Sequence, residues 1–213
     1  MTSLQLIGTP LSHFTRKLRI LLAELGVPFT FVRAPGVLTT TPDTYGGNPL
    51  MRVPTLRDGN VTVFDSEHIA RYLVRRHDPA DRFGVLRERV EDLNRLTLIN
   101  GVMANEVVII LARRAGLEDI DNVAYFRKLG AAIDAALAEL DHSVDVEAPG
   151  FDYRDIALVC MWQHLGHYQL RPGLAGYTRI AARVDRLAAQ PSIASTTPVA
   201  SLAEATAAGW QPG

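Results

Sequence analysis

The stretch "NPLMRVPTLRDGNVTVFDSEHIARYL", residues 48–73, contains a hairpin signal followed by a helix signal. The runs "RVPTL" and "VTVF" are separated by the turn residues Asp58-Gly59-Asn60, which predicts two antiparallel strands joined by a tight turn. Asp65 and Ser66 then provide an N-cap for a helix. We therefore expect a β-hairpin that leads directly into a capped helix.

The dipeptide Val53-Pro54 is the unusual feature of this hairpin, because proline cannot donate a hydrogen bond to a β-ladder. A cis peptide bond would explain it. A cis bond turns the N–H and C=O of Val53 outward, so that this residue can pair with an extended peptide ligand. The alternative is a plain trans proline in an edge strand, which is the commoner state of X-Pro bonds.

The residues before this stretch have the pattern of a βαβ unit. Residues 3–8 alternate as a short strand does, and leucines then recur at positions 18, 21, 22 and 25 with helical spacing. Gly26 and Pro28 stop that helix ahead of the strand-like run Phe29–Val32. Together with the hairpin, this pattern predicts an α/β domain over residues 1–78.

The residues after this domain have a purely helical pattern. The segment "HDPADRFG", residues 77–84, marks the boundary, and Leu86, Val90 and Leu93 begin a long helix. A second amphipathic helix follows at 126–140, and the run 156–162 is apolar on all sides, as expected at the centre of a bundle. We therefore expect an all-helical domain over residues 85–213, with a loosely packed tail from residue 194.

Composition restricts the class of protein. The 213 residues include 22 basic and 23 acidic side chains, so no overall field favours nucleic acid or an anionic membrane. Neither a leader nor an apolar run of about 18 residues is evident, which favours a cytoplasmic protein without a membrane span. Cys160 is the only cysteine, which excludes an internal disulfide or a CxxC redox pair.

The pattern of residues 48–73 resembles the glutathione-binding core of the glutathione S-transferase family. The shared features are asparagine-proline, valine-proline-x-leucine, a hairpin, and an acid-serine pair before a helix. Within the family it resembles the bacterial, cytosolic, serine-type enzymes. The resemblance implies a thioredoxin-like, glutathione-binding domain at 1–78 and a helical-bundle, substrate-binding domain at 85–213.

The resemblance also implies roles for individual residues. Val53 becomes the backbone partner of the cysteinyl part of glutathione, and Pro54 becomes the cis-proline. Asp65 and Ser66 match the acid-serine pair, and their chemistry suits the γ-glutamyl end, since a helix N-terminus with a hydroxyl attracts a carboxylate and an aspartate attracts an ammonium group. The simpler alternative is that Asp65 and Ser66 only cap a helix.

Two neighbouring charges are further candidates for glutathione binding. Arg52 could hold the glycyl carboxylate of glutathione, or it could be a solvated charge. Glu67 is either a first-turn charge favoured by the helix dipole or a second contact to the ligand ammonium.

The loop "TPLSHFTRKL", residues 9–18, provides the candidate catalytic group. Serine-type members of the family often place the sulfur-contacting serine four residues before an arginine, a spacing that Ser12 and Arg16 have. Ser12 would donate a hydrogen bond to the thiolate, aided by the N-terminus of a helix over 16–25. His13 stands where many relatives have proline, and is either a solvated loop residue or a second polar group near the sulfur; Thr9 is the fallback hydroxyl.

The function implied is transfer of glutathione, as co-substrate, to a small hydrophobic electrophile in detoxification, by a homodimer. Two alternatives remain: a glutathione-dependent isomerase of the maleylacetoacetate type, and a non-enzymatic glutathione-binding interaction module. His164 and His167 lie on one helical face but lack an obvious third ligand, so we expect no metal site.

Overall fold

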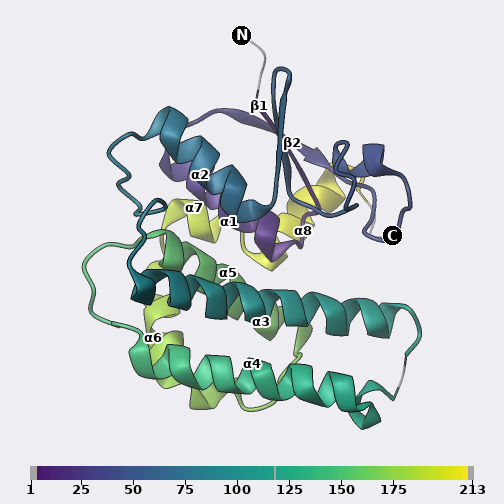
Figure 1. The fold of residues 1–213 in the computed structure, drawn as a ribbon, viewed down its shortest axis with the longest axis vertical. Coiled ribbons are helices and arrows are strands. Elements are labelled where there is room, and N and C mark those ends of the chain that lie inside the picture. Colours follow the sequence, from purple (N-terminus) through teal and green to yellow (C-terminus); the bar gives the residue numbers. More distant parts are fainter. Residues whose placement is uncertain (1–3, 118, 211–213) are drawn as a thin grey trace. The chain divides into compact units, whose positions relative to one another are not determined.

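The computed structural model describes residues 4–117 and 119–210, which divide into two compact units. The first unit comprises residues 1–86 together with 189–213, and the second comprises residues 87–188. The first unit is α/β and the second is helical in its described residues (Figure 1). The predicted combination of an α/β domain and an all-helical region is therefore confirmed.

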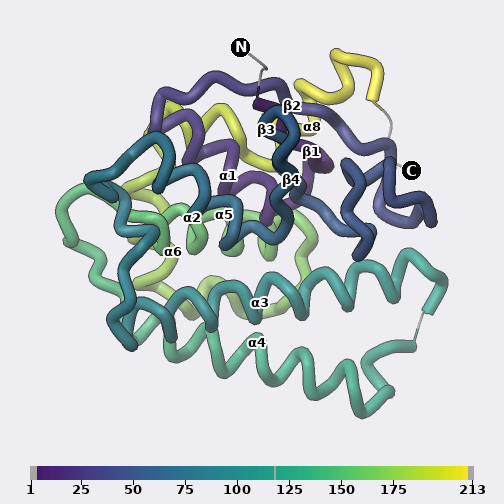
Figure 2. The backbone as a smooth tube through the Cα atoms, turned by 45° about the horizontal axis from the view of Figure 1, so that its top comes forward, coloured from purple at the N-terminus to yellow at the C-terminus, as the bar shows by residue number. Residues whose placement is uncertain are grey.

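A four-stranded mixed sheet organises the first unit. Its strands are β1 (Leu4–Gly8), β2 (Phe29–Arg33), β3 (Thr55–Asp58) and β4 (Val61–Phe64), in the spatial order β2-β1-β3-β4. β1 and β2 are parallel, while β3 is antiparallel to both β1 and β4. The predicted βαβ unit and hairpin therefore form neighbouring parts of one sheet (Figure 2).

Two helices belong to this sheet-bearing unit from the N-terminal part of the chain. Helix α1 (His13–Glu24) connects β1 to β2, and α2 (Ser66–His77) follows β4. The leucine stripe predicted for α1 is buried, with Leu18, Leu21 and Leu22 all inaccessible to solvent. A short 3-10 turn, η1 (Pro42–Tyr45), lies in the connection between β2 and β3.

The second unit contains the helices α3 (Val90–Arg114), α4 (Ala124–Ser143), α5 (Tyr153–Tyr168) and α6 (Thr178–Leu187), with 3-10 turns η2 (Ile120–Asn122) and η3 (Leu174–Gly176). α3 and α4 run side by side (Figures 1 and 2). The apolar α5 is buried along nearly all of its length, as its composition predicts. Asp152 and Asp155 form the expected capping box at its start.

The first turns of α3 differ from the expectation. The helix begins at Val90, which is 65% exposed, and Leu93 is 39% exposed. The buried face of α3 starts only at Ile99. Apolar spacing alone does not show where along a helix its neighbours begin to cover it.

Helix α3 is also long and apolar enough, by length and composition, to cross a bilayer, a test that the core helices of soluble proteins pass as well. This differs from the expectation that no such segment exists. The expectation considered uninterrupted apolar runs, whereas this test averages hydropathy over 18 residues. The average stays high although isolated polar side chains interrupt the apolar runs of α3.

The C-terminal segment corrects the expected division of the chain. Helices α7 (Pro191–Ala194) and α8 (Pro198–Ala207) belong to the sheet-bearing unit, not to the helical one, and they pack beside α1 (Figure 1). The Arg16 guanidinium donates to the carbonyl of Ile193 at 3.2 Å, and the Trp210 indole donates to the carbonyl of Ala34 at 2.9 Å. The segment is therefore hydrogen-bonded to the α/β core and is not a loose tail.

Candidate functional site

The sheet register places the three predicted site segments at one end of the sheet. Ile7 of β1 pairs with Thr55 of β3, and Thr55 pairs with Phe64 of β4. From this row the chain leaves β1 toward Ser12, enters β3 from Pro54, and leaves β4 into Asp65. Segments that are far apart in the sequence thus converge within the first unit.

The first segment is the loop that ends in Ser12. Ser12 is the N-cap of α1, and its Oγ accepts a hydrogen bond from the Thr15 N–H at 3.2 Å. Because a hydroxyl can donate while it accepts, its O–H stays available for a ligand. The helix starts three residues earlier than predicted because Ser12 caps it, which puts the half-buried hydroxyl directly at the positive end of the helix.

The other two candidates in this segment, His13 and Thr9, are buried. His13 is 2% exposed and its ring centroid lies 4.7 Å from that of Phe14, so its interpretation as a solvated loop residue is wrong. Thr9 is 8% exposed, and its carbonyl accepts a hydrogen bond from the Ser12 N–H at 3.1 Å. Thr9 therefore shapes the turn that presents Ser12.

The second segment is the loop before β3. The Val53-Pro54 bond is cis, as predicted, Pro54 is buried and Val53 is half-buried. The buried Asn48 holds this loop, since its amide donates to the carbonyl of Arg52 at 2.9 Å and its Oδ1 accepts from the Leu50 N–H at 3.0 Å. The Arg52 side chain is exposed beside Val53.

The third segment is the start of α2. Asp65 is the N-cap, with its Oδ1 accepting from the Glu67 N–H at 2.9 Å, and Ser66 is the first helical residue and only 4% exposed. Asp65 has φ 76°, a positive value that is uncommon for a residue other than glycine. The exposed Asp65 carboxylate and the N-terminus of α2 therefore offer opposite charges within two residues.

The partner of Glu67 was not predicted from the sequence. Lys17 of α1 is fully buried, and its Nζ lies 2.6 Å from Glu67 Oε1. The carboxylate of Glu67, a candidate for binding the ammonium group of the ligand, is therefore already paired with Lys17. One signal was present, because Lys17 lies four residues before the buried Leu21 and so falls on the apolar stripe of α1.

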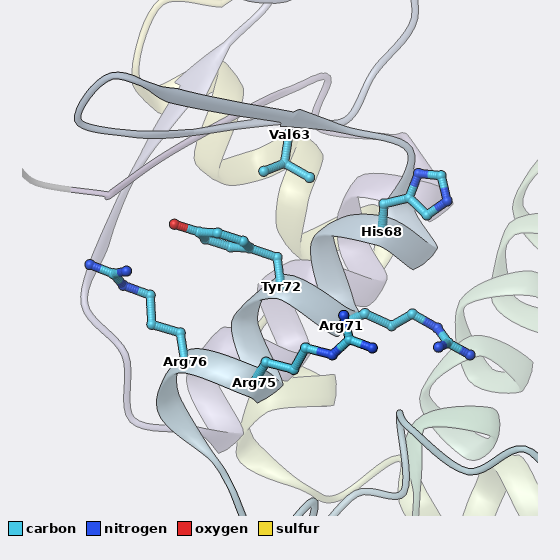
Figure 3. Close-up of a pocket in the computed structure, with 6 residues that line it drawn as sticks. All are labelled: Val63, His68, Arg71, Tyr72, Arg75 and Arg76. Atoms are coloured by element: carbon cyan, nitrogen blue, oxygen red, sulfur yellow. The ribbon is translucent and has the colours of Figure 1, made fainter.

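A pocket of about 560 Å³ lies elsewhere on the same unit and contains none of the predicted site residues. Figure 3 shows it along α2 and β4, lined by Val63, His68, Arg71, Tyr72, Arg75 and Arg76. The Tyr72 hydroxyl donates to Asp58 at 2.8 Å, and Arg76 pairs with the same carboxylate at 3.3 Å. Burial, followed by the hydrogen bond to Asp58, raises the pKa of Tyr72, so this phenol stays protonated near neutral pH.

The second unit contains a buried titratable pair. His164 of α5 is hydrogen-bonded through Nδ1 to Glu106 of α3, while His167, its expected companion, is exposed. Glu106 is fully buried, and this burial raises its pKa well above the ordinary range. Its other oxygen, Oε1, has no hydrogen-bond partner among residues 4–117 and 119–210. The sequence suggested His167 as the companion of His164 because the two lie three residues apart on one helix. In the structure the partner of His164 is Glu106, which comes from a different helix.

Comparison with known proteins gives matches over both units. Residues 6–81 match the family model described as glutathione S-transferase, N-terminal domain. Glutathione S-transferase 4 from Zea mays is 34% identical over 80 residues, which are 36% of this chain and 35% of that protein. The chain therefore matches only about a third of the maize protein's length.

Two solved structures match nearly the whole chain. A glutathione S-transferase from Methylobacterium radiotolerans, in complex with glutathione sulfonate, is 27% identical with a TM-score of 0.76, over 92% of this chain and 95% of that one. A glutathione transferase family member from Pseudomonas fluorescens with bound glutathione is 26% identical with a TM-score of 0.73, over 92% and 99% of the two chains.

Proposed function

We propose that the chain is a glutathione S-transferase, which transfers the thiolate of glutathione, its co-substrate, to a small hydrophobic electrophile, because residues 6–81 match the N-terminal domain of that family and solved members match nearly the whole chain. The observation that carries this proposal is the row Ile7–Thr55–Phe64, which gathers the Ser12 loop, the cis-proline loop and the start of α2 at one end of the sheet. The glutathione sulfonate and the glutathione bound in the two similar structures support the choice of ligand.

Glutathione binds as an extended peptide alongside Val53, whose backbone pairs with the cysteinyl residue. Its α-carboxylate lies at the N-terminus of α2 beside the Ser66 hydroxyl, and its ammonium group lies at Asp65. The exposed guanidinium of Arg52 takes the glycyl carboxylate. Each charged end of the tripeptide thus meets a group of opposite charge on this unit.

Ser12 stabilises the thiolate that attacks the electrophile. Its O–H donates to the sulfur, and the N-terminus of α1 adds a favourable field. Lowering a thiol pKa from ~8.5 by about two units requires ~2.7 kcal/mol, which two or three well-aimed donors supply. The helical unit provides apolar surface for the electrophile, and the protein acts as a cytoplasmic homodimer.

The substitution Ser12→Ala tests the mechanism. We expect the variant to bind glutathione in calorimetry, while the pKa of the bound thiol, followed by the ultraviolet absorbance of the thiolate, rises by about one unit or more. Thr197→Ala is the matched control, because Thr197 caps α8 in the same unit and accepts from the Ala200 N–H at 3.2 Å. An unchanged pH profile in Ser12→Ala would remove Ser12 from the mechanism.

Turnover assays separate the proposed reaction from its alternatives. The transferase consumes thiol in the presence of an aromatic halide or an epoxide. A glutathione-dependent isomerase would instead convert a cis-enone without net thiol consumption, and an interaction module would bind glutathione without turnover over a broad electrophile panel. Light scattering on the purified protein measures whether it is a dimer.

A further inference from the structure

Lys17 is a buried cation that pairs with the first turn of α2, where the γ-glutamyl end of glutathione is proposed to bind. Its side chain has no solvent exposure, and lysine is almost never fully buried unless it is paired. Its Nζ lies 2.6 Å from Glu67 Oε1 and 5.3 Å from the centroid of the Phe14 ring. The partner carboxylate belongs to the first turn of α2, one residue after Ser66.

The charge of Glu67 is a problem for a carboxylate ligand. Asp65 and Glu67 are two anions at the N-terminus of α2, and the Glu67 side chain is 27% exposed, so part of it faces solvent. An uncompensated Glu67 would repel the α-carboxylate of glutathione at Ser66 and offset the attraction of the helix N-terminus. Its pairing with Lys17 removes most of that repulsion.

We propose that Lys17 is a positioning residue that neutralises Glu67, so that the N-terminus of α2 accepts a carboxylate and Asp65 alone receives the ammonium group. This inference rests on the proposed glutathione site and assigns a positioning residue to it.

Four proteins test the inference through the KM for glutathione: wild type, Lys17→Met, Glu67→Gln and the double variant. Lys17→Met removes the cation that pairs with Glu67, and we expect its KM to rise about tenfold or more with kcat within about twofold. Glu67→Gln removes the negative charge next to Ser66, and we expect its KM to fall. The double variant removes both charges, and its KM returns to within about threefold of wild type.

A merely structural ion pair between α1 and α2 predicts a different pattern. In that case both single variants and the double variant would all raise KM, and this result would overturn the inference. Arg19→Met is the matched control, because Arg19 also lies on α1 and pairs at 2.7 Å with Glu204 on α8, away from the start of α2. We expect its KM to stay at the wild-type value.

The inference can still be tested if one of these variants does not fold. If circular dichroism shows that Lys17→Met is unfolded, the double variant decides the question, because a neutral pair in place of a buried ion pair is often tolerated. A KM of the double variant more than about threefold above that of wild type would then overturn the inference. The wild type separates this inference from the proposed function. If calorimetry detects no glutathione binding to wild type, the proposed function fails. If wild type binds and Lys17→Met has the same KM, only the role of Lys17 fails.

Discussion

At Gly8 the end of β1 and the first turn of α1 approach so closely that no side chain fits between them. A Cβ at this position would lie 2.3 Å from Cγ2 and 2.5 Å from Oγ1 of Thr15. Thr15 is fully buried, so it cannot swing out into solvent. Gly8 therefore sets the distance between the strand and the helix that Ser12 caps.

We expect Gly8→Ala to lower the free energy of unfolding by about 1–3 kcal/mol, the usual effect of overpacking a core. Adding Thr15→Ala should restore part of this loss, because the Thr15 Cβ would remain 2.9 Å from the new methyl group. Urea unfolding measures both. Gly101→Ala is the control, since nothing lies within 4 Å of the methyl group that it would add and a mid-helix alanine is favoured over glycine. Equal stability of Gly8→Ala and wild type would contradict this explanation.

At the level of elements, Asp65 has two separable functions at the start of α2. Its carboxylate caps the helix, and its charge is proposed to bind the ammonium group of glutathione. Asparagine caps helices about as well as aspartate and is also enriched at positive φ, but it carries no charge. Asp65→Asn therefore removes the proposed ligand contact and keeps the cap.

For Asp65→Asn we expect a free energy of unfolding within about 0.5 kcal/mol of wild type and glutathione affinity at least tenfold weaker, because a charge-assisted hydrogen bond contributes about 1.5–3 kcal/mol. Thermal unfolding and calorimetry measure the two quantities on the same sample. Asp65→Ala should lose both stability and affinity. Unchanged affinity in Asp65→Asn would leave Asp65 with the capping role alone.

Elements with a strong local signal could be predicted from the sequence. The leucines of α1, the Asp58-Gly59-Asn60 turn and the Asp152 capping box each act within a few residues, and each is present in the structure. The features that were missed depend on packing between distant segments. The pairing of Lys17 with Glu67 joins α1 to α2, and that of His164 with Glu106 joins α5 to α3. No periodicity within one helix contains that information.

At the scale of the whole molecule, the chain ends in the unit where it begins. Arg19 and Arg33, from α1 and β2, both pair with Glu204 of α8. These contacts explain why the expectation of a loose tail from residue 194, which rested on composition, was wrong. A stretch rich in Ala, Ser and Thr resembles a loose tail, but its polar side chains are hydrogen-bonded to α1, as Thr196 is to Arg16 across a separation of 180 residues. A domain boundary drawn from the sequence assigns consecutive residues to one domain. In the structure, residues 189–210 instead belong to the same unit as residues 4–86.

The buried Glu106 makes the stability of the whole protein depend on pH. Burial raises its pKa in the folded state, while the same carboxyl titrates near about 4.3 in the unfolded chain. Between these two values the unfolded chain loses the proton and the folded protein keeps it. The stabilising contribution of the protonated carboxyl is therefore complete below the unfolded pKa and is lost as pH rises toward the folded pKa.

Glu106→Gln keeps the shape of the protonated acid but does not titrate. We expect wild type to lose stability relative to this variant as pH rises above the ordinary carboxyl pKa of about 4.3, by up to about 1.4 kcal/mol per pH unit. Urea unfolding of both proteins from about pH 4 to pH 7 gives the difference, from which the contributions of groups that do not contact Glu106 cancel. Glu147→Gln, whose side chain is 76% exposed, should run parallel to wild type. If Glu106→Gln also runs parallel to wild type, burial does not raise the pKa of Glu106 in the folded protein.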